Sequence, residues 1–404
     1  MPDHSAHSFP RFTLLAKPVG AACNLECSYC FYREKEQLYP GSDFRMNADV
    51  LEAYIRQRLA CQPTGEVEIA WQGGEPTLIE LNFYQHAVEL VKKYKTPRQR
   101  VVYSLQTNGT LLDDEWCAFF KKHDFLIGIS LDGPADLHNT YRVNKAGRGS
   151  FERASRGWNL LQQHQVETNI LCAVHAANAC QPIEVYSFFR DTLAARFIQF
   201  IPIVEKLEVV SESQPPTNAH EPGNLVNPRS VGAEQYGRFL SRIFDEWVRH
   251  DVGSVFVQNF EVALASWCHL PSSVCTFQEV CGRSLILEHN GDLYSCDHFV
   301  DPAHRLGNIL ERPMKELVES TQQDRFGLDK RERLSVNCQK CPVKFACWGE
   351  CPRNRFLPTP GGEASGNYLC PSYKFFFRHI DQQMRWMANL LRRGLPAAEI
   401  MRII

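Results

Sequence analysis

Three closely spaced cysteines near the N-terminus form the segment of this sequence best suited to chemistry. The segment CNLECSYC places Cys23, Cys27 and Cys30 in a C-x3-C-x2-C spacing. A structural zinc ion takes four tetrahedral ligands and an ordinary four-iron cluster takes four thiolates, so three thiols complete neither set. Three thiolates would hold a four-iron cluster and leave one iron open to a ligand that is not protein. The spacing therefore predicts an enzyme that works at an iron–sulfur site.

The chain carries further cysteines in numbers that indicate metal binding. Eight of its 16 cysteines lie between Cys275 and Cys370. Five others are scattered along the chain: Cys61, Cys117, Cys172, Cys180 and Cys268. Closely spaced thiols in a reducing compartment favour metal sites over disulfides. Eight thiols make two four-ligand sites that either zinc or iron would satisfy, and the iron predicted for the first loop favours iron–sulfur clusters.

The overall composition is that of an ordinary globular protein. The 404 residues are 44% hydrophobic and 22% charged, with a formal net charge of −2. This balance gives no support to nucleic acid or an anionic membrane as the main partner. No apolar run has the length of a signal peptide or a membrane span, so we expect a cytoplasmic protein.

The elements that must position these cysteines alternate along the first half of the chain. Apolar, β-branched runs predict strands over 12–17, 67–71, 101–107, 126–131, 169–174 and 197–201. Helical periodicity predicts helices near 48–60, 82–94, 114–122, 151–164 and 182–192. Six strand–helix units in succession imply an α/β fold whose parallel sheet curls, with the helices outside. Because a complete barrel has eight units, we expect a partial (β/α)6 barrel.

The second half of the chain has a different character. Residues 205–231 are polar and rich in Pro, Asn and Ser, which predicts a linker or a surface excursion. A helix near 233–249 leads into the cysteine-rich region, and the basic stretch 373–393 is helical in period. We therefore expect a barrel over 1–231, an iron–sulfur domain over 232–377 and a C-terminal helix over 378–404. That helix is expected to pack on the domain rather than on a membrane surface.

Polar motifs follow the predicted strands at the edge where a barrel builds its active site. The cysteine loop follows the first strand, QGGEP the second, QTNGT the third and SLDG the fourth. Each motif also has a plain structural explanation, since Gly73-Gly74 suits a turn, Asp132 a helix N-cap and Arg142 a surface cation. Glycines also let a backbone approach a ligand, and the Glu75 carboxylate could hold a ligand ammonium. Polar groups after four consecutive strands favour a binding site.

A hairpin is expected within the second cysteine region. Asn290-Gly291 between two apolar runs predicts a two-residue turn. That turn would pair Leu285 with Cys296 across the strands. Cys281 would then lie just beyond the pair, so we expect Cys281 and Cys296 to converge on one metal centre.

Together these motifs resemble the radical S-adenosylmethionine (SAM) family. The matching segments, which span roughly residues 23–377, are CNLECSYCFY, WQGGEPTL, YSLQTNGTLLDDEW, ISLDGPADLHNTYR, EHNGDLYSCDHFV, RLGNI and NYLCPSYKFF. They are most similar to the anaerobic sulfatase-maturating enzymes, whose cysteine-rich extension is called SPASM. The resemblance implies three [4Fe-4S] clusters, the first at Cys23, Cys27 and Cys30. It assigns the first auxiliary cluster to Cys275, Cys281, Cys296 and Cys351, and the second to Cys338, Cys341, Cys347 and Cys370. Replacement of one of these assigned ligands by Cys268 stays an open alternative.

The resemblance also implies how SAM is bound. The residues placed at SAM are Tyr32, Gln72, Gly73, Gly74, Glu75, Gln106, Asn108, Ser130, Asp132 and Arg142. The GGEP segment would bind the methionine amino group, and the Tyr32 ring would stack on the adenine.

The implied reaction converts a Cys or Ser side chain of a sulfatase peptide to Cα-formylglycine through a 5′-deoxyadenosyl radical. Asp297 is the expected base, with a pKa raised by its position beside a cluster. The expected partners are the sulfatase polypeptide and an electron donor such as flavodoxin or ferredoxin, and we expect a monomer. Two alternatives stay open at this point. One is a related SPASM enzyme that forms a thioether, an epimer or a crosslink, and the other is a zinc-stabilised binding module without catalysis.

Overall fold

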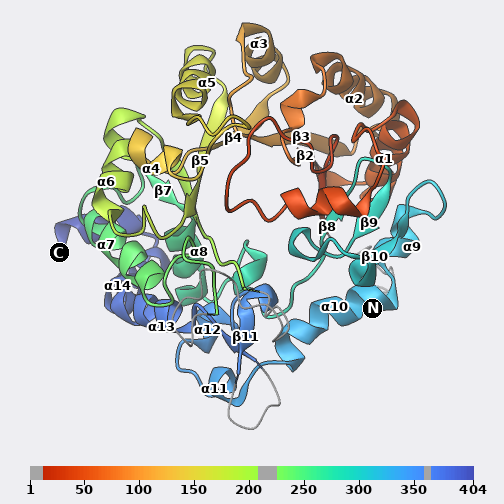
Figure 1. Cartoon of the computed structure of the whole chain (residues 1–404). Helices are drawn as coiled ribbons and strands as arrows, with labels where there is room; N and C mark the ends of the chain where they lie inside the picture. The colour runs from red at the N-terminus through yellow and green to blue at the C-terminus, as the bar shows by residue number, and fades with distance from the viewer. Residues whose placement is uncertain (1–11, 208–224, 359–364) are drawn as a thin grey trace, which may run out of the picture.

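The centre of the fold is a curled sheet of parallel strands. The computed structural model describes residues 12–207, 225–358 and 365–404, so most of the linker predicted at 205–231 lies outside the described residues. Six strands pair in sequence order: β1 (Thr13–Ala16), β2 (Gly65–Trp71), β3 (Gln99–Thr107), β4 (Phe125–Ser130), β5 (Glu167–Val174) and β6 (Phe197–Pro202). Figure 1 shows them as an arc with helices on its outer side. The α/β fold and the partial (β/α)6 barrel are confirmed.

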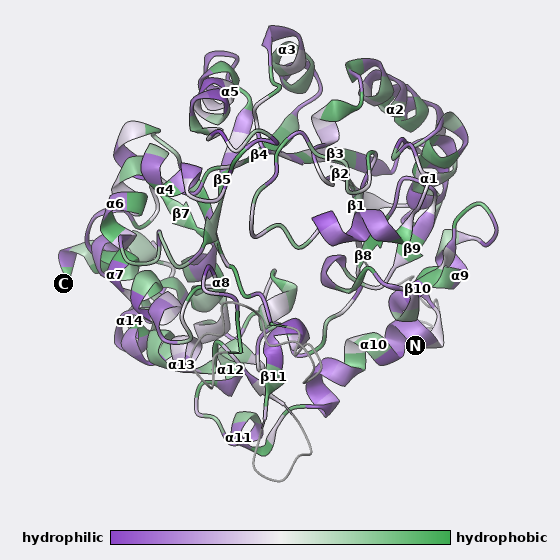
Figure 2. Ribbon diagram, in the orientation of Figure 1, coloured by the Kyte–Doolittle hydropathy of each residue, from purple (hydrophilic) through white to green (hydrophobic). Residues whose placement is uncertain are grey.

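The outer helices begin where the sequence predicts them. They are α1 (Ala48–Cys61), α2 (Leu81–Tyr94), α3 (Asp114–Lys122) and α5 (Phe151–Gln163). The Asn47 side chain caps α1 by accepting from the backbone N–H of Val50 at 2.9 Å. Helices α2, α3 and α5 carry both hydrophobic and hydrophilic colours along their length (Figure 2), because each buries one face on the sheet.

Two parts of the barrel differ from the prediction. The fifth predicted helix is the shorter α6 (Pro182–Ser187), continued by the π-helical turn η3 (Phe188–Thr192). A further short helix, α4 (Ala135–Asn139), follows β4 and was not predicted.

The sheet continues past the barrel at both edges. β7 (Phe256–Val257) pairs in parallel with β6, and β8 (Ser284–Leu287) pairs in parallel with β1. β9 (Asp292–Tyr294) and β10 (Arg305–Asn308) extend it in antiparallel fashion, which gives ten strands in one sheet. Strands of the cysteine-rich region therefore share a sheet with the barrel, which the sequence did not predict. The division into three domains stays a prediction.

The hairpin of β8 and β9 has a different register from the predicted one. Ile286 lies opposite Tyr294, so Leu285 does not pair with Cys296 and the two-residue turn is wrong. The loop instead holds three residues, the last of which is Gly291 with φ of +91°. An αL glycine closing a three-residue loop is a common alternative to the two-residue turn, and one added loop residue shifts the cross-strand pairing by one.

The predicted C-terminal helix consists of two helices. α13 (Cys370–His379) packs against α7 (Gln235–His250), and α14 (Asp381–Arg392) packs against α8 (Gln258–Trp267). Because the two helices have different neighbours, the chain turns between them at the fully buried Ile380. The short helix η8 (Ala397–Arg402) follows. Packing on the domain is therefore confirmed, and in the described ranges no helix combines the length and apolarity needed to cross a bilayer.

The rest of the cysteine-rich region is built from short elements. These are η4 (Cys275–Phe277), η5 (Asp297–Phe299), η6 (Pro302–His304), α9 (Met314–Val318), α10 (Thr321–Glu332), α11 (Val336–Gln339), α12 (Lys344–Cys347), η7 (Pro352–Asn354), β11 (Arg355–Leu357) and β12 (Gly366–Asn367). Many of the cysteines lie within or next to these elements, which bring together thiols that are far apart in the sequence.

Candidate functional site

The loop after β1 carries the first three cysteines, and the loop after β2 supports it through the backbone. The N–H of Gly74 donates to Gly20 O at 2.8 Å, and the N–H of Glu75 donates to Ala22 O at 2.9 Å. A Cβ built on Gly74 would lie 1.9 Å from Ala22 O, which is far inside van der Waals contact. Only glycine therefore allows the two loops to approach so closely.

This close approach predicts that one methyl group added at Gly74 will disturb the cysteine loop. We expect Gly74→Ala to displace the cysteine loop, because the atoms in its way are backbone and cannot rotate aside. Iron and sulfide analysis of anaerobically purified protein should show a loss of about four irons, one cluster, relative to the unsubstituted chain. Gly327→Ala is the matched control, since its Cβ would meet nothing nearer than 3.4 Å. Wild-type iron content in Gly74→Ala would contradict this role of Gly74.

The Glu75 side chain connects the loops after β2 and β3. It is fully buried and accepts from Thr77 Oγ1 at 2.6 Å, from Thr107 Oγ1 at 2.7 Å and from the N–H of Asn108 at 2.7 Å. Burial raises the pKa of Glu75, although these donors oppose the rise. In this geometry the carboxylate is a brace between strand ends, and its contact with a ligand ammonium stays a prediction.

The loop after β3 holds the first thiol in place. Asn108 Nδ2 donates to Asn24 Oδ1 at 2.9 Å and lies 3.9 Å from Cys23 Sγ. Asn24 Nδ2 in turn donates to Thr110 Oγ1 at 2.8 Å. The sequence prediction that polar groups of this strand end meet the cysteine loop is therefore confirmed as a matter of geometry.

Three other predicted residues lie at the same rim. Gln106 Nε2 donates to Ser130 Oγ at 3.1 Å, which joins the ends of β3 and β4. The Oε1 atom of Gln72 is buried and has no hydrogen-bond partner among the described residues. A buried amide oxygen without a donor fits a ligand that brings one, as the ammonium of SAM would.

Asp132 anchors the third thiol from the end of β4. It is fully buried and accepts from Tyr29 Oη at 2.5 Å, from Arg142 Nε at 2.8 Å and from the N–H of Ala173 at 2.9 Å. Burial acts to raise the pKa of Asp132, but Arg142, together with His138 and His175, outweighs it and the pKa is lowered. Tyr29 directly precedes Cys30, so this buried ion pair fixes the end of the cysteine loop. Asp132 is not an N-cap and Arg142 is not a surface cation.

His138, beside this ion pair, gives the fold a defined acid sensitivity. Its Nδ1 accepts from the N–H of Asp132 at 3.4 Å, its Nε2 lies 3.0 Å from Ser150 Oγ, and burial lowers its pKa from 6.5 to about 3. A lowered folded pKa means that the unfolded chain binds the proton more tightly. The contribution is therefore complete above pH 6.5 and is lost as the pH falls toward about 3.

We expect the free energy of unfolding to fall by about 2 kcal/mol between neutral pH and pH about 5 through His138 alone. Denaturant midpoints across that range should show a shallower slope for His138→Gln, which does not titrate. His86→Gln, at an exposed site, is the control. Identical slopes in the wild type and His138→Gln would contradict the assignment.

Tyr32 lies in a buried cluster of its own. Its ring is 3% exposed, its Oη donates to Glu288, and Lys17 Nζ lies 3.4 Å from the ring centroid. The ammonium therefore covers one face of the ring, as in a cation–π contact. Stacking of this ring on adenine stays a prediction.

Asp297 opens η5 directly after Cys296, with Oδ1 2.5 Å from Lys17 Nζ. Burial acts to raise the pKa of Asp297, but Lys17, together with His298 and Arg353, outweighs it and the pKa is lowered. The predicted direction of the pKa shift is therefore wrong, because the partner lies 280 positions away in the sequence. A carboxylate that is ionised at neutral pH is ready to accept a proton.

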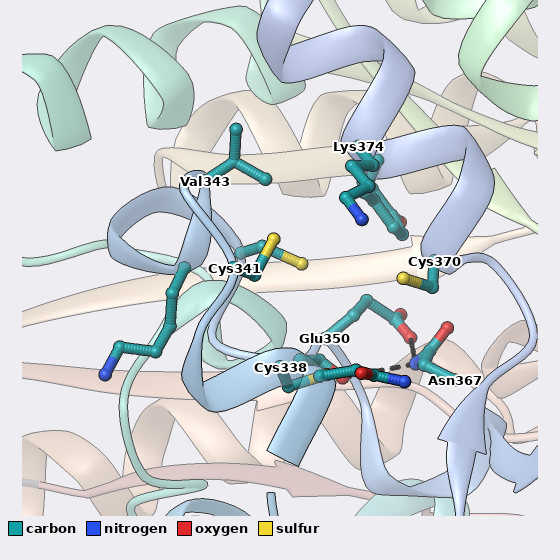
Figure 3. Close-up of a pocket in the computed structure, with 12 residues that line it drawn as sticks. Cys338, Cys341, Val343, Glu350, Asn367, Cys370 and Lys374 are labelled. Atoms are coloured by element: carbon teal, nitrogen blue, oxygen red, sulfur yellow. Dashed lines mark hydrogen bonds between the residues drawn. The ribbon is translucent and has the colours of Figure 1, made fainter. Parts of the chain in front are cut away.

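The eight later cysteines separate into two groups of four around two cavities. One cavity is lined by Cys275, Cys281, Cys296 and Cys351. A second cavity is lined by Cys338, Cys341, Cys347 and Cys370. In Figure 3 the sulfur atoms of Cys341 and Cys370 point into the same space. This grouping is the one that the resemblance implied, and Cys268 lines neither cavity.

The donor chemistry of these thiols fits iron–sulfur clusters. Burial raises the pKa of Cys23 to about 12, of Cys27 to about 11 and of Cys296 to about 12, so the free thiols are protonated at neutral pH. The positive charge of bound metal would ionise them. In the described part of the chain no three His, Cys, Asp or Glu side chains are arranged to hold one metal ion. The later thiols instead surround volumes, as the ligands of a four-iron cluster do.

Three further residues belong to the site and were not predicted from the sequence. His298 and Arg353 line a cavity of about 220 Å³ that also touches Tyr29 and Phe31 of the cysteine loop. Arg353 lies 4.6 Å from the Phe31 ring centroid, and His298 Nδ1 lies 3.7 Å from Cys351 Sγ. The third residue, Lys17, had a sequence signal, since it is a charged residue at the end of an apolar strand. Arg353 had none.

Comparison with known proteins supports both halves of this arrangement. Residues 18–189 match the model of the radical SAM superfamily, and residues 275–342 match that of an iron–sulfur cluster-binding domain. The serine-type anaerobic sulfatase-maturating enzyme of Bacteroides thetaiotaomicron is 42% identical, over 97% of this chain and 94% of that protein. The cysteine-type enzyme of Clostridium perfringens is 32% identical, over 95% and 100%. The structure of native anSMEcpe with bound AdoMet and Kp18Cys peptide matches with a TM-score of 0.82 at 32% identity, covering 93% of this chain and 99% of that one.

Proposed function

The chain belongs to the anaerobic sulfatase-maturating enzymes of the radical SAM superfamily, and on this premise we propose that it oxidises a serine side chain of a sulfatase polypeptide to Cα-formylglycine. Conversion of a Ser or Cys side chain is the activity of the family. The choice of serine is supported by the higher identity to serine-type relatives, 42% against 32% for a cysteine-type enzyme. Iron–sulfur clusters and bound SAM are likewise properties of this family.

The observation that carries the proposal is the sorting of eleven thiols into one open and two closed sets. Cys23, Cys27 and Cys30 lie at the strand-end rim as a set of three. The eight others surround two cavities, four to each. We assign three [4Fe-4S] clusters to these sets, the first with an iron open to SAM and the two others fully ligated by cysteine.

The residues of the rim would bind and orient SAM. In the proposal, the methionine end of SAM is surrounded by Gln72, the Gly73-Gly74 backbone and Asn108. Glu75 holds these segments together through its hydrogen bonds. The SAM site is bordered at the ends of β3 and β4 by Gln106, Ser130, Asp132 and Arg142. Tyr32 is placed at the adenine of SAM. When bound, SAM and its cluster would supply the removal of one hydrogen atom from the substrate Cβ, and the auxiliary clusters would supply an acceptor for the second electron.

Asp297 would complete the oxidation. An alcohol becomes an aldehyde by losing one hydrogen atom from carbon, one electron, and one proton from oxygen. Asp297 is ionised by its ion pair with Lys17 and is next to the ligand Cys296, so it is placed to accept that proton. Two cavities share Phe31, His298 and Arg353 in their linings, and His298 directly follows Asp297 in the chain. We propose this side of the fold as the entrance for the peptide. We further propose flavodoxin or ferredoxin as the electron donor, and a monomeric enzyme.

The test is an anaerobic incubation of the enzyme with reductant, SAM and a sulfatase-motif peptide carrying Ser, Cys or Ala at the target position. The Ser peptide should lose the mass of two hydrogens and the Ala peptide should be unchanged. Metal analysis should give about twelve irons per chain and little zinc. Release of 5′-deoxyadenosine with every peptide unmodified would indicate another SPASM reaction. Preference for the Cys peptide would overturn only the choice of serine.

A further inference from the structure

Lys17 is a buried lysine at the junction of the two halves of the fold. It directly follows β1, and its side chain is 1% exposed. Its backbone N–H donates to Leu287 O in β8 at 2.8 Å, which holds Lys17 against that strand. The cysteine loop begins a few residues later, and Lys17 therefore stands beside the proposed reaction site.

The Lys17 side chain makes two contacts that bridge the barrel and the cysteine-rich region. Its Nζ lies 2.5 Å from Asp297 Oδ1 and 3.4 Å from the centroid of the Tyr32 ring. Tyr32 is itself held, because its Oη donates to the buried Glu288. The contacts with the carboxylate of Asp297 and the ring of Tyr32 together fix the position of the Lys17 ammonium. The ammonium in turn fixes the position of the Asp297 Oδ1 atom.

A stability role alone does not explain a charged group here. Removing an ammonium from water is costly, and well-packed apolar side chains are often as stable as a buried ion pair. The ion pair does fix the orientation of the Asp297 carboxylate, because a charge-assisted hydrogen bond holds one of its two oxygens. No hydrogen bond to the other oxygen, Oδ2, is found among the described residues. Because the Asp297 side chain is 21% exposed, we take Oδ2 as the oxygen left for a substrate proton.

We propose that Lys17 is a positioning residue, which holds the Asp297 carboxylate by Oδ1 so that Oδ2 faces the proton to be removed. The proposal rests on the proposed function, in which Asp297 is the base. Lys17 does not touch the substrate in this scheme and takes no proton from it. Its loss should therefore affect the second half of the oxidation more than the formation of 5′-deoxyadenosine.

The experiment measures aldehyde formed per 5′-deoxyadenosine released, with the reconstituted enzyme and the Ser peptide. For Lys17→Met we expect this ratio to fall by roughly 10-fold to 100-fold, less than complete loss of a general base. Lys17→Arg, which keeps the charge and a donor, should recover most of the ratio. Lys93→Met makes the same change in an exposed ion pair with Glu52 and should leave the ratio unchanged.

A double substitution tests whether Lys17 acts through Asp297. If it does, Lys17→Met combined with Asp297→Asn should be no worse than Asp297→Asn alone, since the effects of coupled residues do not add. A ratio in Lys17→Met equal to the wild type, or a double variant that loses the full product of both effects, would overturn the proposal. If Lys17→Met and Lys17→Gln both lose iron or fail to fold, Lys17 is structural and the proposal is also overturned. Full product from Asp297→Asn would instead remove Asp297 as the base, whatever Lys17 does.

Discussion

Replacement of Cys27 by alanine is expected to abolish the release of 5′-deoxyadenosine and the formation of aldehyde together. Cys27 is buried in the cysteine loop between Cys23 and Cys30, and no other cysteine of the loop can take its place. Two thiolates do not hold a cubane with one open iron, so SAM would have no metal to bind. The two auxiliary sets are separate cavities and should keep about eight irons.

The measurements are iron and sulfide content and chromatography of SAM products under reducing, anaerobic conditions. The control is Cys180→Ala, because Cys180 is exposed and lines neither thiol cavity. We expect that control to have full iron content and full turnover. Deoxyadenosine release by Cys27→Ala at the wild-type rate would show that the radical chemistry does not start at this loop.

Asp297→Asn should separate the two halves of the reaction. Asparagine has nearly the shape of aspartate but cannot accept a proton, so deoxyadenosine formation should continue while aldehyde falls by roughly 10²-fold to 10⁴-fold. Iron content should stay at the wild-type value, because Asp297 supplies no thiolate. The substitution also leaves the Lys17 ammonium without its carboxylate, so a lower unfolding temperature is expected as well.

Mass spectrometry of the Ser peptide, together with deoxyadenosine quantified in the same reaction, checks this prediction. Asp301→Asn is the matched control, since Asp301 caps η6 four residues later and asparagine also serves as a cap. It should behave as the wild type does. Undiminished aldehyde from Asp297→Asn would assign the proton to a different acceptor.

Most of the barrel could be predicted from the sequence because its signals are local. Apolar β-branched runs and helical periodicity give the strands and helices to within a few residues, and polar motifs at the strand ends identify the rim. Turn length is a weaker signal. The Asn290-Gly291 pair indicated a hairpin correctly but not its three-residue loop, so the register was shifted by one.

The remaining features depend on contacts between distant segments. Spacing alone could not pair Cys296 with Cys351 or exclude Cys268, and the grouping came from the family resemblance. The pKa of Asp297 is lowered by Lys17, which nothing near Asp297 in the sequence reveals. The pairing of β8 with β1 could not be predicted either, since the sequence of a short apolar strand does not indicate which sheet edge it joins.

The placement of β1 between β2 and β8 has a consequence for how the chain is made. The ribosome releases β1 first, and β2 can cover one of its edges soon afterwards. Its other edge waits for β8, which is translated only after the whole barrel and the segment beyond it. Until then a nascent β1 presents unpaired N–H and C=O groups, the feature of a sheet that most readily recruits a wrong partner. The strand that leads into the cysteine loop is thus made before both of its neighbours and can be paired on both edges only once β8 has been made.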